Sequence, residues 1–254
     1  IGQSGQSATL TLTDGGALNA ASTVNVARFS GSGALNIGAG AGQTAAAAGT
    51  ITAGSLTFGN GDGSLVFNHT GSAYSFATDI RGTGTIAAHA GTTILTGNNT
   101  AFTGKTVVNG GTLRAGGANA FADNTTYEIH GGTLDLGGHD LTMSRLWGTG
   151  GTLTSTGSEA DLTLDQDDVT GFSGEISGLG NLTKTGFGTV FLRGDTTVSG
   201  AIGVDEGIVS FGGGKTLTSG RGSITAAGTR DADVEISGAG TRWTVGSDLT
   251  LGET

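Results

Sequence analysis

The 254-residue sequence contains no cysteine and no proline, and only 13% of its residues are charged. Without cysteine no disulfide can form, and four scattered histidines do not supply the ligands of a structural zinc site. Without proline or a strict Gly-X-Y period, a collagen triple helix is excluded. No run of 18 apolar residues occurs, so we expect no membrane insertion by this segment. We also expect no bound metal and no cofactor.

Positive charge is scarce as well. The 11 lysines and arginines are spread singly, and the formal net charge is −10. A nucleic acid would be repelled by such a chain, because binding a phosphate backbone requires a basic patch. The sequence begins at Ile1, with neither an initiator methionine nor a signal peptide, which indicates a piece of a larger protein.

The sequence is rich in glycine and in short segments in which apolar and polar residues alternate. Fifty-two residues are glycine, and 35% are hydrophobic. Apolar residues alternate with polar ones in runs such as TLTLT at residues 9–13 and TLDL at residues 133–136, which is the period of a β-strand. Gly, Asn, Asp and Ser separate these runs and favour turns. No sustained helical period occurs, so the sequence predicts an all-β fold.

One module occurs twice. Residues 80–116 align with residues 176–212, with a one-residue gap that opens and then closes again. The match extends upstream, so the copies cover about residues 65–116 and 162–212. The aligned pairs include Gly82 with Gly178, Gly84 with Gly180, Ile86 with Leu182, Gly97 with Gly194, and Gly111 with Gly207. Such repeats stack as coils that bury one continuous apolar column.

A solenoid of this kind explains both extremes of the composition. Glycine supplies the positive φ or the close backbone approach that corners need, and proline would remove a hydrogen bond from an interior strand. Coils of roughly 20–25 residues give about 10–13 coils. Parallel crossovers are nearly always right-handed. We therefore predict one domain over residues 1–254, an all-β right-handed parallel β-helix.

Several motifs resemble one known family. Residues 178–194, GLGNLTKTGFGTVFLRG, resemble the first half of the passenger-associated repeat of type V secretion autotransporters, and residues 97–113 resemble its second half. Residues 65–76 are similar to other passenger phrases. From about residue 234 a second type of passenger repeat follows, with its Gly-x-x-Trp-x-Val-Gly core at Trp243.

The resemblance implies a fold, a location and a range of functions. Autotransporter passengers fold as right-handed parallel β-helices. They are exported through the periplasm and the outer membrane, and they remain at the bacterial cell surface or are released. Most act as adhesins, autoaggregation and biofilm factors, toxins or proteases, often in virulence. The absence of cysteine fits this export, because a periplasmic disulfide would block the passage of an unfolded chain.

Catalytic patterns are weak. Neither a G-x-S-x-G string nor a comparable protease motif occurs. One acidic run could supply the acid and base of a polysaccharide-cleaving enzyme or the oxygen ligands of Ca²⁺, although such runs are usually solvated corners. Its members are Glu159, Asp161, Asp165, Asp167, Asp168 and Glu175. We expect no enzyme and no catalytic residues.

Two sets of residues are candidates for recognition. Asp165, Asp167 and Asp168 are our candidate face for self-association or ligand binding. Arg193, Gly194 and Asp195 spell the tripeptide that some integrins bind. The aligned residues of the first copy are Thr96-Gly97-Asn98, so the Gly and the Asp or Asn also serve the turn, and only Arg193 is additional.

The sequence leaves three functions open. The first is a surface adhesin or self-association module, whose partner is the same chain on neighbouring cells or a component of a host surface or matrix. The second is a passive stalk that presents another domain, and the third is a polysaccharide-cleaving enzyme. The four histidines are predicted to be surface or turn residues, and Trp147 and Trp243 are predicted to stack in the buried column.

Overall fold

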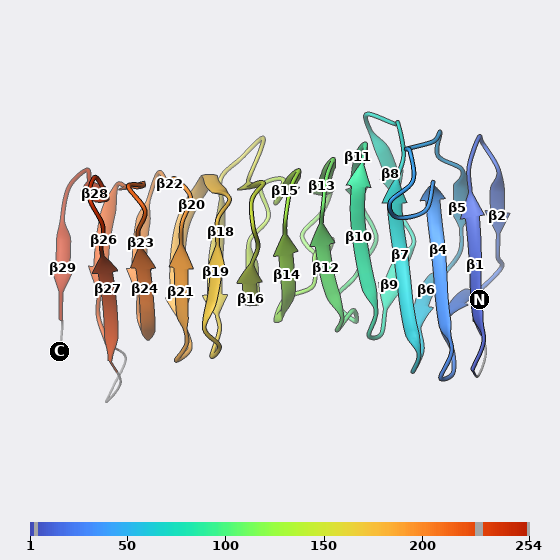
Figure 1. The fold of residues 1–254 in the computed structure, drawn as a ribbon, viewed down its shortest axis with the longest axis horizontal. Coiled ribbons are helices and arrows are strands. Elements are labelled where there is room, and N and C mark those ends of the chain that lie inside the picture. Colours follow the sequence, from blue (N-terminus) through green and yellow to red (C-terminus); the bar gives the residue numbers. More distant parts are fainter. Residues whose placement is uncertain (3–4, 227–230, 253–254) are drawn as a thin grey trace. The chain divides into compact units, whose positions relative to one another are not determined.

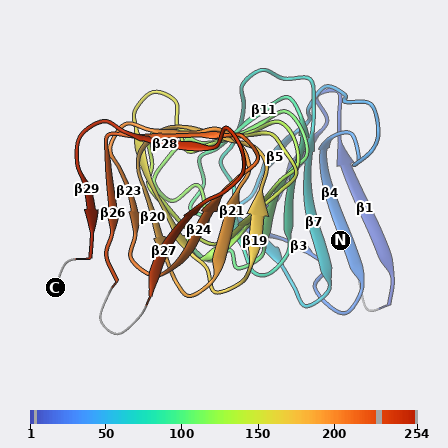
Figure 2. The ribbon, with the colours of Figure 1, turned by 60° about the vertical axis from the view of Figure 1, so that its left-hand side comes forward.

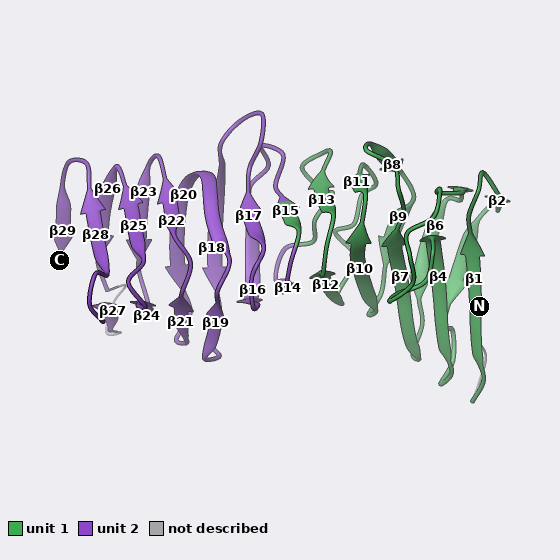
Figure 3. Cartoon of the chain, turned by 45° about the horizontal axis from the view of Figure 1, so that its top comes forward, with its two compact units in different colours: residues 1–122, 132–134 green, residues 123–131, 135–254 purple. Residues whose placement is uncertain are grey.

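The computed structural model describes residues 1–2, 5–226 and 231–252, and all regular structure in these ranges is β-strand (Figure 1). The chain is a parallel β-solenoid of about 11 turns, which confirms the predicted fold class and coil number. Within the described ranges, no helix has the length and apolar character needed to cross a membrane. Two compact units are distinguished in Figure 3: unit 1 comprises residues 1–122 and 132–134, and unit 2 comprises residues 123–131 and 135–254. The prediction of one domain, and the module boundaries, stay predictions.

Unit 1 is built from parallel ladders in which each coil contributes one strand to each side. The longest ladder runs through β1 (Ser7–Leu12), β4 (Ser32–Gly38), β7 (Asp62–Asn68), β10 (Thr85–Ala90) and β12 (Lys105–Val108). A second ladder contains β8 (Tyr74–Phe76), β11 (Thr92–Leu95) and β13 (Thr112–Ala115). Others contain β3 (Thr23–Val26), β6 (Ser55–Phe58) and β9 (Asp79–Arg81), and β2 (Ala17–Asn19) with β5 (Thr50–Thr52).

The described strands of unit 2 form three ladders. The first runs through β14 (Thr125–Ile129), β16 (Leu141–Trp147), β18 (Ala160–Asp165), β20 (Glu175–Thr185), β23 (Ala201–Val204), β26 (Arg221–Ile224) and β29 (Leu249–Leu251). The second contains β17 (Thr152–Thr154), β20, β22 (Thr196–Val198), β25 (Thr216–Ser219) and β28 (Arg242–Val245). The third, seen in Figure 2, contains β19 (Thr170–Phe172), β21 (Thr189–Leu192), β24 (Gly207–Phe211) and β27 (Ala232–Ile236). Strand β15 (Thr133–Asp135) has residues in both units.

The core of each unit is a set of apolar rows that run from coil to coil. In unit 2, Leu141, Leu162, Leu182 and Ile202 lie side by side in register, and all are buried. The parallel register places identical kinds of side chain above one another, so the period-two pattern of each strand buries the same face in every coil. Burying one such side chain contributes about 1.5–3 kcal/mol, which makes these rows the main stabilising element.

Glycine is required where coils meet at a corner. A Cβ placed on Gly194 would overlap the carbonyl oxygen of Gly174 in the preceding coil. The aligned Gly97 has more room, because its Cβ would lie 2.8 Å from the carbonyl oxygen of Thr78. Real Cβ atoms almost never approach backbone this closely, so both positions exclude a side chain unless the coils separate.

Candidate functional site

The candidate face of unit 2 is a turn between β18 and β19 that carries exposed carboxylates. Asp165 ends β18, and Asp167 and Asp168 lie in the turn that follows. The Oδ1 atom of Asp165 accepts a hydrogen bond from the Thr185 hydroxyl at 3.2 Å. The Oδ1 atom of Asp167 accepts one from the Phe187 N–H at 2.9 Å. The structure therefore brings the three predicted residues onto one turn, where two of them also hold the next coil.

Two large apolar side chains stand beside these carboxylates. Val169 is 70% exposed and Phe187 is 58% exposed. They lie on adjacent coils, because Asp167 bonds to the backbone of Phe187 and Thr170 pairs with Val190. We call Asp165, Asp167, Asp168, Val169 and Phe187 the acidic corner. No pattern in the sequence marks Val169 and Phe187 as candidate binding residues. Only their exposure in the structure does so.

The third carboxylate is tied to the preceding coil. The Oδ2 atom of Asp168 lies 3.8 Å from Nη1 of Arg145, and both side chains are substantially exposed. An exposed ion pair of this length contributes at most about 1 kcal/mol. Asp168 is therefore available to a partner at little cost in stability.

A buried lysine lies beneath the acidic corner. Lys184 is only 1% exposed, and its ammonium group donates hydrogen bonds to backbone carbonyl oxygens on three coils. The acceptors are Gln166 at 3.2 Å, Thr185 at 2.6 Å, Gly186 at 2.5 Å and Glu206 at 3.4 Å. These bonds occupy the donors of the ammonium group and hold the turns together, so the acidic corner rests on a rigid base.

Burial lowers the pKa of Lys184 from its ordinary value of 10.5 to about 8. Asp167, Asp165 and Glu206 act in the opposite direction, because their negative charges favour the charged ammonium. Two of the candidate carboxylates thus also compensate the buried charge. The Lys belongs to the repeat motif, but its burial follows only from the stacked coils.

The Arg193-Gly194-Asp195 tripeptide follows β21 directly. The Oδ1 atom of Asp195 accepts a hydrogen bond from the Thr216 N–H at 2.8 Å, and its Oδ2 atom lies 3.8 Å from Nζ of Lys215. Gly194 is buried, and the Arg193 guanidinium lies over the Phe191 ring, 5.0 Å from its centre. The Gly and Asp serve the coil as the alignment indicates, and recognition through this tripeptide stays a prediction.

The remaining members of the acidic run have separate places in the coil. The Oδ1 atom of Asp161 accepts hydrogen bonds from the N–H and the side-chain amide of Asn181, both at 2.9 Å. Asp161 and Asp165 lie four residues apart on one extended strand, about 13 Å, which is too far for a glycosidase pair. Among the residues that the structure describes, no three His, Cys, Asp or Glu gather into a possible metal site.

One histidine was predicted wrongly. His69 is fully buried, where we expected a surface or turn position. Its Nδ1 atom accepts a hydrogen bond from the Gly71 N–H at 3.1 Å, which leaves Nε2 to donate to the Thr93 hydroxyl at 2.7 Å. Burial lowers the pKa of His69 below its ordinary value. Because both ring nitrogens are paired, the histidine can occupy the interior as a neutral group.

Both tryptophans were expected to stack inside the column; both are half-buried, and of the two Trp243 lies in an inward row. Trp147 packs edge-on against His130, with ring centres 4.8 Å apart. The indole N–H of Trp243 donates to the Ser219 hydroxyl at 3.0 Å. Trp243 pairs in register with the buried Leu217, and a Cβ on the buried Gly222 would lie 2.7 Å from its ring, so this indole belongs to the inward row of its ladder.

Parts of two known proteins are similar in sequence to this chain. The adhesin BmaC autotransporter of Brucella suis biovar 1 (strain 1330) is 34% identical over 204 residues, which cover 77% of this chain and 6% of that protein. The uncharacterized lipoprotein YdeK of Escherichia coli (strain K12) is 38% identical over 173 residues, which cover 65% of this chain and 12% of that protein. The chain thus spans a small part of each relative. No family model matches the chain. No solved structure matches it either.

The chain is a parallel β-solenoid with short coils and glycine corners, and the regular secondary structure of its described part is all β-strand. Together with the similarity to an autotransporter adhesin, this fold confirms the resemblance to autotransporter passengers.

Proposed function

We propose that this segment is a non-enzymatic adhesion module of an autotransporter passenger, displayed at the bacterial cell surface. Support comes from its similarity to a protein named as an adhesin and from the solenoid fold. The observation that carries the proposal is the acidic corner of unit 2. There, Val169 and Phe187 expose apolar side chains beside three carboxylates, so a partner can be held by apolar contact and selected by charge.

The architecture suits weak contacts made many times. Cells that display many copies of one module bind through multivalency, so each contact can be weak while the whole attachment is strong. The hydrogen bonds of the buried Lys184 fix the backbone beneath the acidic corner. The side chains of the acidic corner are therefore held in place before a partner binds. A fixed surface loses less conformational entropy on binding. The partner is the same chain on a neighbouring cell or a component of a host surface.

Display on cells tests the proposal. The segment is placed on a neutral autotransporter barrel in bacteria that do not aggregate, and settling and attachment to immobilised matrix proteins are compared with the barrel alone. We expect faster settling or firmer attachment. If neither changes, the adhesion proposal is wrong and the segment is a passive stalk.

Matched variants locate the contact. The double change Val169→Ser with Phe187→Ser should reduce adhesion several-fold, because it removes the exposed apolar surface. The triple change of Asp165, Asp167 and Asp168 to Asn removes charge but keeps the side-chain acceptors that hold the next coil. Phe29→Ser is the control, because Phe29 is an exposed aromatic residue of unit 1 and does not belong to the acidic corner. If the double variant, the triple variant and the Phe29→Ser control adhere equally well, the acidic corner is not the binding surface.

A further inference from the structure

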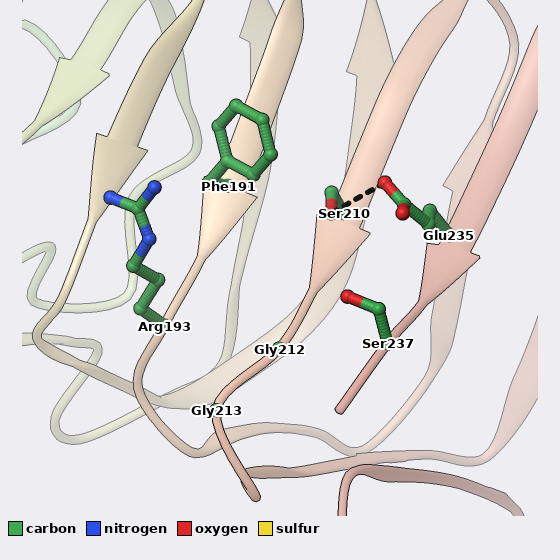
Figure 4. Close-up of a pocket in the computed structure, with 7 residues that line it drawn as sticks. All are labelled: Phe191, Arg193, Ser210, Gly212, Gly213, Glu235 and Ser237. Atoms are coloured by element: carbon green, nitrogen blue, oxygen red, sulfur yellow. Dashed lines mark hydrogen bonds between the residues drawn. The ribbon is translucent and has the colours of Figure 1, made fainter. Parts of the chain in front are cut away.

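A hollow lies on the outer face of the third ladder of unit 2 (Figure 4). Its volume is about 310 Å³, which is large enough for one or two sugar rings. Seven residues of strands β21, β24 and β27 and of the segments after them line it: Phe191, Arg193, Ser210, Gly212, Gly213, Glu235 and Ser237.

The register of the strands creates the hollow. Gly171, Phe191, Ser210 and Glu235 lie side by side in one row across the four strands. Only Phe191 and Glu235 in this row carry large side chains, and they are two strand spacings apart, about 10 Å. Ser210 between them is small. Gly212, directly after β24, adds no side chain, so the space between Phe191 and Glu235 remains open.

The polar groups around the hollow suit a hydroxylated ligand. The Glu235 carboxylate accepts a hydrogen bond from the Ser210 hydroxyl at 3.0 Å, and the Ser237 hydroxyl lies on the same side of the hollow (Figure 4). Both Glu235 and Ser237 are exposed. A carboxylate and a hydroxyl that face an aromatic ring across such a space can receive the hydroxyl groups of a sugar whose apolar face rests on the ring.

A guanidinium group at the same place lacks an acidic partner. Arg193 extends over Gly171, where a Cβ would lie 2.7 Å from its Nη1 atom, and its guanidinium covers one side of the Phe191 ring. It makes no ion pair and no hydrogen bond through its side chain with any residue that the structure describes. A planar guanidinium with free donors is suited to a carboxylate, which it can bind through two parallel hydrogen bonds.

We propose that this hollow binds an acidic polysaccharide, with one sugar ring between Phe191 and Glu235 and the carboxylate of a neighbouring sugar on Arg193. The inference rests on the proposed adhesive function and names a chemical class of ligand for it. It also gives Arg193 a role that does not depend on the tripeptide. The net charge of −10 opposes an anionic chain at long range, but charges more than about 8 Å away are largely screened at physiological salt.

Binding of defined oligosaccharides to the 254-residue chain tests the proposal. Hyaluronan tetrasaccharide alternates N-acetylglucosamine with glucuronate, and chitotetraose contains N-acetylglucosamine alone. We expect saturable binding of the hyaluronan fragment at 0.15 M salt, measured by NMR titration. Chitotetraose should bind about 10-fold more weakly or worse, because it lacks the carboxylate for Arg193.

Three variants make the test specific. Arg193→Gln should weaken hyaluronan binding about 10-fold or more, because a charge-assisted pair is lost. Gly212→Val should abolish binding by filling the hollow, and a Cβ at Gly212 meets its nearest atoms only at ordinary contact distances of 3.6 Å and above. Arg221→Gln is the matched control, because Arg221 is an exposed arginine on β26 of the same unit.

The proposal is overturned if the hyaluronan fragment does not bind, if chitotetraose binds equally well, or if binding survives both Arg193→Gln and Gly212→Val. These outcomes are independent of the cell assay. A chain that binds the saccharide but gives no adhesion when displayed contradicts the adhesive function alone. If the displayed chain adheres but does not bind the saccharide, the proposed ligand is wrong and the adhesive function stands.

Discussion

The two copies of the repeat module hold the same corner by different means. In the copy within unit 1, Asn99 is buried and joins three coils. Its Oδ1 atom accepts a hydrogen bond from the Ile80 N–H at 2.7 Å, and its side-chain amide donates to the Ala120 carbonyl at 2.7 Å. One side chain thus satisfies two buried backbone groups.

In the copy within unit 2, Thr196 takes the place of Asn99. It pairs with Ile176, and the N–H of Ile176 is bonded to the backbone carbonyl of Asp195 at 3.0 Å. The Thr196 hydroxyl is buried and has no hydrogen-bond partner among the described residues. The bond to the preceding coil at this corner is therefore made by a side chain in unit 1 and by the backbone carbonyl of Asp195 in unit 2.

A second pair of aligned residues shows the reverse. Lys184 of unit 2 occupies the position of Ala88 in unit 1, and both are buried. The ammonium group of Lys184 serves four carbonyl oxygens, whereas Ala88 contributes only apolar surface. The repeat thus conserves the path of the backbone, and each copy finds its own donors and acceptors for the groups left at the corners.

Replacing the buried lysine should have the largest effect. Lys184→Met keeps the length of the side chain but leaves carbonyl oxygens without donors, so we expect unit 2 to lose about 3 kcal/mol or more. Both tryptophans lie in unit 2, so urea unfolding followed by tryptophan fluorescence reports on this unit. Lys215→Met, at a partly exposed lysine that lies 3.8 Å from the Asp195 carboxylate, should change stability by less than about 0.5 kcal/mol. Equal effects of the two changes would contradict the capping role of Lys184.

Alanine at the corner glycines should distinguish the copies next. Gly194→Ala overlaps the Gly174 carbonyl oxygen and should cost about 2–3 kcal/mol, because the coils must separate. Gly97→Ala meets the Thr78 carbonyl oxygen at 2.8 Å and should cost about 1 kcal/mol. Hydrogen exchange of the neighbouring strands measures the loss of stability in both variants. A larger loss for Gly97→Ala than for Gly194→Ala would contradict the expected order.

The aligned pair Asn99 and Thr196 should respond in opposite ways. Asn99→Leu leaves the Ile80 N–H and the Ala120 carbonyl unpaired, so unit 1 should lose about 2 kcal/mol. Thr196→Val removes a hydroxyl that has no partner and preserves the shape, so unit 2 should be unchanged or slightly more stable. Hydrogen exchange reports on unit 1 and tryptophan fluorescence on unit 2. Destabilisation by Thr196→Val would show that its hydroxyl is paired.

A change of one pH unit should have the smallest effect, and the two units should respond in different ranges. Burial lowers the pKa of His69, so the unfolded chain binds more protons below about pH 6.5, and unit 1 loses stability as the pH falls through that value. Burial lowers the pKa of Lys184 to about 8, so the unfolded chain binds more protons between about pH 8 and 10.5, and unit 2 gains stability as the pH rises. One group contributes at most about 1.4 kcal/mol per pH unit.

Matched variants assign these two slopes. His69→Gln should flatten the acid slope of hydrogen exchange in unit 1, since the aligned residue of the second copy is Gln166, which is also fully buried. A residual acid slope should remain from His89, whose pKa burial also lowers. Lys184→Met should flatten the alkaline slope of unit 2 and leave unit 1 unchanged. If His69→Gln changes the pH dependence of unit 2, or Lys184→Met changes that of unit 1, the assignment of the slopes to these two residues is wrong.

The fold could be predicted because its signals are local and repeat. The alternation of Leu162 and Leu164 with polar neighbours determines which face of β18 is buried, and the same pattern in each coil determines that the coils stack in parallel. The recurring glycines mark the corners. The candidate carboxylates Asp165, Asp167 and Asp168 could be singled out because they cluster in a chain with few charges.

The sequence by itself determined an all-β solenoid, its approximate coil number and its likeness to autotransporter passengers. Only the tertiary structure decided the roles of single side chains: the burial of His69 and Lys184, the exposure of Val169 and Phe187, and the hollow beside Phe191. Periodicity reports which face of a strand points inward. Periodicity does not report which residues of neighbouring coils lie beside one another. That depends on the register between coils, which is determined by the lengths of the turns between their strands, and these lengths differ.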